Sequence, residues 1–190
     1  MTLPTVHLAR HGETEWSLSG RHTGRTDLPL TEHGEQAARG LADRLRGLAP
    51  AKVFTSPLQR AARTCALAGF GDVAEREDGL LEWDYGQYEG LTTKQILQQR
   101  PDWQLFRDGC PGGESPADIG ARADAVVARV RAIDGVVLLF SSAHILRVLA
   151  ARWLGQPVDT GRLLVLGTAS LSVLGYEHDR SESVIRAWNG

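Results

Sequence analysis

The sequence predicts an α/β fold: a doubly wound, mostly parallel sheet flanked by helices on both faces. Apolar runs typical of strands alternate along the chain with segments of helical periodicity. The run 136–141 (VVLLFS) is almost wholly apolar, which is typical of a parallel strand buried on both faces. The chain has 190 residues, 42% of them hydrophobic, and we expect them to form one domain over residues 1–190.

The first half of the chain predicts three strands and two helices. The strands are expected at 5–9, 51–55 and 73–76. One helix is expected over 32–48, with Thr31 as its N-cap. A second is expected to open at Ser56-Pro57, since serine before proline suits the start of a helix.

The second half begins with an irregular segment, 77–114, that is rich in glycine and aromatic residues. A short helix is expected inside it over 92–99, because Thr92 and Gln95 have the spacing of a capping box. Ser115-Pro116 predicts the start of a long helix reaching about residue 133, and a further helix over 144–154 should stop at Gly155. Two closing strands are predicted at 171–176 and 184–188.

Composition excludes several classes of function. The net charge of −2 gives no overall attraction for nucleic acid. No apolar run reaches the roughly 18 residues of a membrane span, and the N-terminus has no signal-peptide pattern. The two cysteines, Cys65 and Cys110, match no metal or redox motif and are expected to be free thiols. We therefore expect a cytoplasmic protein that binds neither membranes nor nucleic acid.

Polar stretches follow two of the predicted strands at their carboxyl ends. Arg10-His11-Gly12 comes directly after the first strand, and Ser141 to His144 follows the apolar strand at 136–141. Ligands of open α/β sheets bind in the crevice outside the carboxyl ends of the strands. The sequence therefore predicts a ligand site where these two stretches meet.

The residue types around His11 suit phosphate chemistry. An imidazole can attack phosphorus, the guanidinium fork of Arg10 matches phosphate oxygens, and Gly12 lets the backbone approach a ligand. For the tripeptide alone, a hydrogen-bonded histidine at a turn is an equally good interpretation.

Longer motifs carry a more specific resemblance. The string LARHGETEW (8–16) resembles the signature of the histidine phosphatase superfamily, which has a phosphoglycerate-mutase-like fold. The strings RHTG (21–24), LTEHG (30–34), TSPLQRA (55–61), LEWDYGQYEG (81–90) and PGGES (111–115) also resemble that family in order and spacing. The resemblance extends over essentially the whole chain.

The resemblance implies a role for each matching residue. His11 would be the phosphorylated nucleophile, and Glu82 would protonate the leaving oxygen and later activate water. The phosphate-binding residues would be Arg10, Arg60, Ser17, Ser142 and Ala143. The substrate-binding residues would be Arg21, Thr23, Gly24, Tyr85 and His144. No metal and no cofactor is implied.

The chain departs from the family at one catalytic position. Ser142 stands where a second histidine is expected, and Ala143 where glycine is expected. Losing one preorganised donor costs on the order of 10²–10³ in rate. His144 would reach the pocket if the strand continued that far, since alternate residues of a strand share a side. Three interpretations remain: a working phosphatase with a modified pocket, a weakened or inactive relative, and an altered variant of an active enzyme.

Hydrolysis of a small phosphorylated metabolite is the expected reaction. A phosphoglycerate-mutase-type phosphotransferase is the first alternative, but only about 30 residues separate Glu82 from Ser115, which leaves water easy access. A non-catalytic module that binds phosphorylated ligands is the second. A metal enzyme is disfavoured because paired histidines at ligand spacing are missing from the sequence. The substrate is not predicted, and pairing of two copies through an exposed strand edge stays open.

Overall fold

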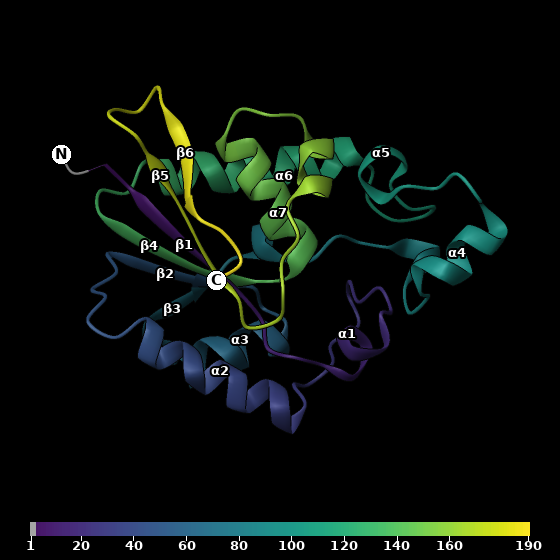
Figure 1. The fold of residues 1–190 in the computed structure, drawn as a ribbon, viewed down its shortest axis with the longest axis horizontal. Coiled ribbons are helices and arrows are strands. Elements are labelled where there is room, and N and C mark those ends of the chain that lie inside the picture. Colours follow the sequence, from purple (N-terminus) through teal and green to yellow (C-terminus); the bar gives the residue numbers. More distant parts are fainter. Residues whose placement is uncertain (1–2) are drawn as a thin grey trace.

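The fold is known from a computed structural model, which describes residues 3–190. A single mixed sheet of six strands forms its centre, in the order β3-β2-β4-β1-β5-β6 (Figure 1). The strands are β1 (Thr5–Arg10), β2 (Lys52–Thr55), β3 (Ala74–Arg76), β4 (Val136–Ser141), β5 (Leu171–Tyr176) and β6 (Ser183–Ala187). All six lie where the sequence predicts strands, with bounds that differ by a residue or so.

The pairing of the strands agrees with a mostly parallel sheet. Strands β3, β2, β4 and β1 run parallel, whereas β5 and β6 add an antiparallel edge. In the register of β1 and β4, Arg10 lies opposite Ser141, the last residue of each strand. The two polar stretches that follow these strands are therefore neighbours, as the sequence predicted.

Helices cover both faces of the sheet, as expected. Figure 1 shows α2 and α3 below the sheet and α6 and α7 above it. The helices are α1 (Glu15–Ser19), α2 (Glu32–Arg44), α3 (Gln59–Leu67), α4 (Thr93–Gln99), α5 (Leu105–Asp108), α6 (Pro116–Arg131) and α7 (Ala143–Trp153). Short 3₁₀ helices are η1 (Gly71–Val73), η2 (Asp78–Leu80), η3 (Gly86–Tyr88) and η4 (Val158–Leu163).

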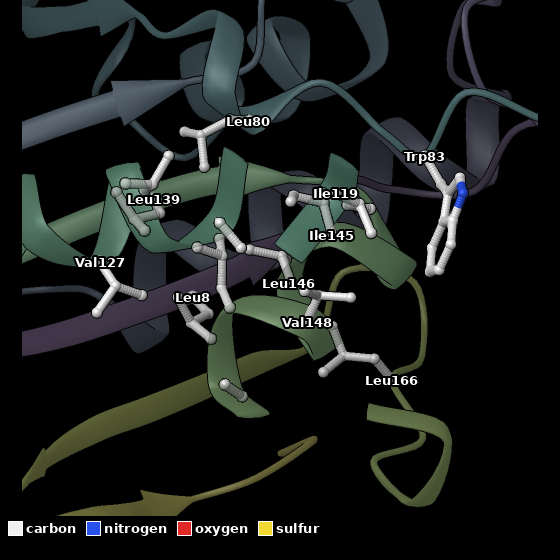
Figure 2. Close-up of a cluster of buried hydrophobic side chains, with 14 of the residues drawn as sticks. Leu8, Leu80, Trp83, Ile119, Val127, Leu139, Ile145, Leu146, Val148 and Leu166 are labelled. Carbon is white, nitrogen blue, oxygen red and sulfur yellow. The ribbon is translucent and has the colours of Figure 1, made fainter. Parts of the chain in front are cut away.

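Each face of the sheet has its own hydrophobic core. Side chains such as Leu8 and Leu139 pack under α6 and α7, where Ile119, Ile145 and Val148 join them (Figure 2). On the other face, Leu41 of α2 and Cys65 of α3 cover β1, β2 and β4. Burial on both faces explains why β4 is apolar almost throughout.

Three helix boundaries differ from prediction. Helix α3 begins at Gln59 rather than at Ser56-Pro57, because the Ser56 hydroxyl accepts from the Leu58 amide within a turn that precedes the helix. Helix α2 ends at Arg44 rather than residue 48. Helix α7 begins at Ala143, so β4 does not continue to His144. The caps at Thr31, Thr92 and Ser115 are confirmed.

Two other predictions concern the surface and the thiols. Both cysteines are free, as predicted, and both are buried. Within residues 3–190, no helix combines the length and the apolar character needed to cross a membrane. Strands β3 and β6 form the edges of the sheet, and pairing of two copies through an edge stays a prediction.

Candidate active site

His11 lies just beyond β1 and is fixed by backbone hydrogen bonds on both sides. Its amide donates to the Ser141 carbonyl of β4 at 2.9 Å, and its carbonyl accepts from the Ala169 amide at 3.0 Å. The side chain is only 4% exposed, yet it lines a pocket of about 260 Å³. The backbone of His11 is therefore fixed, and its imidazole lines a cavity that a small ligand can enter.

The hydrogen bond of the ring fixes its tautomer. Nδ1 of His11 lies 2.7 Å from the carbonyl oxygen of Gly12, which can only accept, so Nδ1 carries the proton. Burial, followed by the charges of Arg10 and Arg60, holds the pKa of His11 well below its usual value. The neutral ring keeps a lone pair on Nε2, as a nucleophile requires.

Two arginines bring positive charge to this imidazole. Arg10 lines the pocket, and its buried Nε has no hydrogen-bond partner among residues 3–190. Arg60, at the start of α3, is completely buried. Burial lowers the pKa of both guanidinium groups, and the Glu82 carboxylate opposes that effect. These charges favour an anion beside His11.

Arg60 also holds the loop 20–27, which we call the mouth loop. Its Nη2 donates to the carbonyls of Thr23 and Gly24 at 3.0 and 2.9 Å, and its Nη1 donates to the carbonyl of Thr26 at 2.9 Å. Its Nε donates to the Ser142 hydroxyl at 3.3 Å. One guanidinium thus links Ser142, just before α7, to the mouth loop.

Glu89 also holds the mouth loop, as an acceptor of hydrogen bonds where Arg60 is a donor. Its carboxylate accepts from the amide of Gly24 at 2.9 and 3.0 Å and from the amide of Thr26 at 3.1 Å. A side chain at Gly24 would not fit, because its Cβ would lie 2.5 Å from the Trp83 carbonyl oxygen. Gly24 therefore serves the packing of the mouth loop and does not line the pocket.

Glu82 is a buried carboxylate that lines the pocket. Its Oε1 accepts from the amides of Trp83 and Ile145 at 2.8 and 2.9 Å, and its Oε2 accepts from the amide of His144 at 3.0 Å. The first turn of α7 therefore fixes the carboxylate. It lines the same cavity as His11, as its predicted role of general acid requires.

His144 reaches the pocket for a different reason than the sequence suggested. It lies in the first turn of α7, so the helix, not an extended strand, turns its ring into the cavity. Its Nδ1 lies 2.6 Å from the hydroxyl of Tyr85. Burial, and after it the charge of Arg147, keeps the pKa of His144 well below its usual value.

The pocket gathers nine of the twelve predicted site residues. They are Arg10, His11, Ser17, Arg21, Thr23, Glu82, Tyr85, Ala143 and His144. Gly24, Arg60 and Ser142 do not line the pocket; Arg60 and Ser142 are buried and contact each other. The structure establishes where these side chains lie, and their chemical roles stay predictions.

Three further residues line the pocket that the sequence did not single out: Gly20, His22 and Thr93. His22 lies between Arg21 and Thr23 in the string RHTG, so its neighbours could have identified it as a pocket residue. No sequence signal identifies Thr93, because an isolated bridge between Arg21 and Thr92 brings it to the pocket. Within residues 3–190, no three histidine, cysteine or carboxylate side chains gather as metal ligands would. Independence from metal stays a prediction.

Comparisons with known proteins agree with this geometry. Residues 6–189 match the model of the histidine phosphatase superfamily (branch 1). An acid phosphatase of Mycobacterium tuberculosis is 44% identical over 178 residues, which span 90% of this chain and 86% of that protein. Sedoheptulose 1,7-bisphosphatase of Saccharomyces cerevisiae is 36% identical, over 82% of this chain and 69% of that protein.

The solved structure of the open reading frame Rv3214 of Mycobacterium tuberculosis has the same fold. It superposes with a TM-score of 0.91 at 39% identity, over 97% of this chain and 96% of that one. The motifs, the order of the strands and the residues of the pocket thus have one explanation. The chain belongs to the histidine phosphatase superfamily, branch 1.

Proposed function

We propose that this protein hydrolyses phosphate monoesters of small metabolites by transferring the phosphoryl group to His11. The observation that carries the proposal is the 2.7 Å contact between Nδ1 of His11 and the carbonyl oxygen of Gly12, from which the tautomer of the ring follows. A neutral imidazole, protonated on Nδ1 by its bond to Gly12, keeps the Nε2 lone pair in a pocket with Arg10. The phosphatase names of the relatives support the reaction class.

The reaction has two steps. In the first, Nε2 of His11 attacks phosphorus, the bond from phosphorus to the leaving oxygen breaks, and Glu82 gives a proton to that oxygen. In the second, Glu82 takes a proton from water, the water oxygen bonds to phosphorus, and the bond to Nε2 breaks. Arg10 counters the charge on the phosphoryl oxygens from within the pocket, and Arg60, which does not line it, adds its positive charge from the protein interior. The second step regenerates the neutral imidazole.

Steady-state hydrolysis of p-nitrophenyl phosphate tests the proposal. We expect turnover by the natural chain, none by His11→Ala, and no effect of a chelator. Phosphate binding without turnover would favour a non-catalytic binding module. Loss of turnover on chelation would contradict the mechanism. A mutase would transfer the group to an acceptor and release little inorganic phosphate, so the yield of phosphate separates the two reactions.

The compartment and the partner are part of the proposal. The two buried free thiols support a cytoplasmic location, since reducing compartments keep cysteines free. The expected partner is a small phosphorylated metabolite, and the modest volume of the pocket supports a ligand of that size.

A further inference from the structure

Three aromatic rings form part of the pocket lining. His22, Tyr85 and His144 come from the mouth loop, the segment before η3 and the start of α7. The ring centroids lie 4.8 Å apart for His22 and Tyr85, 6.1 Å for the two histidines, and 5.9 Å for Tyr85 and His144. Three distant segments therefore form one continuous surface, which we call the ring wall.

Each imidazole of the ring wall uses one nitrogen within the protein. Nδ1 of His144 bonds the Tyr85 hydroxyl, and Nε2 of His22 lies 3.2 Å from the hydroxyl of Thr93. Among residues 3–190, neither Nε2 of His144 nor Nδ1 of His22 has a protein hydrogen-bond partner, and neither atom is fully buried. Because both rings line the pocket, these second nitrogens are available to a ligand.

The ring wall carries no charge near neutral pH. Burial lowers the pKa of His22 to about 4, and the pKa of His144 is also well below its usual value. Burial likewise raises the pKa of Tyr85, which stays a neutral phenol. A carboxylate or second phosphate placed against this wall would lose water without forming an ion pair with any of its three rings.

The cations near the ring wall interact with other groups or are exposed to solvent. Arg10 lines the same pocket and its charge also lowers the pKa of His144, but it is the neighbour of His11, so the transferred phosphoryl group takes up its charge. Arg21 lines the pocket but is exposed, with its guanidinium 5.9 Å from the ring centroid of Trp16. Arg147 donates to the carbonyls of Gly161 and Arg162. A hydroxyl, in contrast, both donates and accepts, so it pairs with a neutral imidazole in either tautomer.

We propose that the ring wall selects a neutral, hydroxyl-bearing leaving group, so that the substrate class is a monophosphate of a sugar or polyol. This rests on the proposed phosphatase function. The second nitrogens of His22 and His144 bind hydroxyl groups, and the ring of Tyr85 packs against carbon. His22 is then a specificity-determining residue. A phosphoglycerate or a bisphosphate, with a second anion, is a poorer substrate.

A substrate panel tests this with the full chain. The probes are glucose 6-phosphate, 3-phosphoglycerate, fructose 1,6-bisphosphate and p-nitrophenyl phosphate. We expect kcat/KM for glucose 6-phosphate to exceed the values for 3-phosphoglycerate and fructose 1,6-bisphosphate, which carry a second anionic group, by about tenfold. This is the effect of roughly one net hydrogen bond. If the value for either of these two esters matched or exceeded that for glucose 6-phosphate, the inference would fail while the phosphatase function stood. No turnover of any probe would sink the proposed function itself.

Two variants of His22 locate the effect. His22→Phe keeps a ring but removes both nitrogens, so the ratio of kcat/KM for glucose 6-phosphate to that for p-nitrophenyl phosphate should fall about tenfold. His22→Gln keeps a donor and an acceptor and should retain part of the ratio. A ratio within one preparation does not depend on the folded fraction. An unchanged ratio in His22→Phe would overturn the assignment.

Discussion

Nε of Arg60 donates a hydrogen bond to the hydroxyl of Ser142 at 3.3 Å, and both side chains are buried. Because Ser142 accepts this bond, its own hydroxyl proton remains to be donated. This arrangement occupies the position where the family resemblance leads one to expect a second histidine. The Ser142 hydroxyl thus accepts from Nε of Arg60 and keeps one proton that it can donate.

Ser142→Ala should therefore lower kcat for p-nitrophenyl phosphate by about tenfold, less than the 10²–10³ typical of a stronger preorganised donor. The variant loses a donor and leaves Nε of Arg60 without its partner. Stopped-flow or steady-state assays measure the effect, with Ser19→Ala, an exposed hydroxyl, as the control. An unchanged kcat would mean that the hydroxyl of Ser142 takes no part in the reaction.

Arg60→Lys should destabilise the protein as well as slow it. A lysine has no planar fork, so it cannot serve the three mouth-loop carbonyls together. Leaving buried acceptors unpaired should lower the free energy of unfolding by about 3 kcal/mol, measured in urea. Arg63→Lys, one turn along α3 in an exposed pair with Glu35, should change it little. A loss below about 1 kcal/mol for Arg60→Lys would contradict the clamp on the mouth loop.

Glu89→Ala should raise KM more than it lowers kcat. The variant frees the amides of Gly24 and Thr26 and loosens the loop that carries Thr23 into the pocket. We expect KM for p-nitrophenyl phosphate to rise about tenfold, with partial recovery in Glu89→Gln, whose amide oxygen still accepts. Glu77→Gln is the matched control, since Glu77 also accepts from a backbone amide but away from the site. Equal KM values in Glu89→Ala and the natural chain would count against this role.

Much of the fold was predictable because local signals and burial agreed. The apolar run of β4 and the caps at Thr31, Thr92 and Ser115 place their elements within a few residues. The start of α3 was mispredicted because Ser56 bonds within a turn rather than capping a helix. The short helices α1 and α5 were missed because five and four residues carry almost no periodicity.

The site was predictable where strand order determines it and not where loops do. His11 and Ser142 follow neighbouring strands, so their proximity follows from the sheet. Thr93 and the mouth loop meet through contacts across about 70 residues, such as the bond of Thr93 to His22, which no pattern encodes. The structural, carbonyl-binding role of Arg60 was likewise visible only in three dimensions.

Acid should weaken the fold partly through His22. The folded-state pKa of about 4 lies below the unfolded value of 6.5, so between those values the unfolded chain binds more protons. Stability contributed by neutral His22 is thus present above pH 6.5 and lost as pH falls toward 4. His22→Gln should flatten the slope by up to about 1.4 kcal/mol per pH unit, less for partial exposure.

Urea unfolding at pH 7, 6, 5 and 4.5 measures this slope. His178→Gln, which replaces an exposed histidine in the β5–β6 turn, is the control. A slope identical in His22→Gln and the natural chain would show that His22 is not held neutral by the fold. The His22→Gln variant keeps a residual slope, because His11 and His144 are also buried.

Rapid quenching with ³²P-labelled substrate tests the central claim most directly, by asking whether phosphate becomes bonded to His11. We predict label on the protein during turnover that survives alkali and is lost in acid, as a phosphoramidate is, and that is missing from His11→Ala. Peptide mapping should place it on the segment that contains Arg10 and Gly12. Unlabelled protein during undiminished turnover, or equal labelling of His11→Ala, would contradict the account.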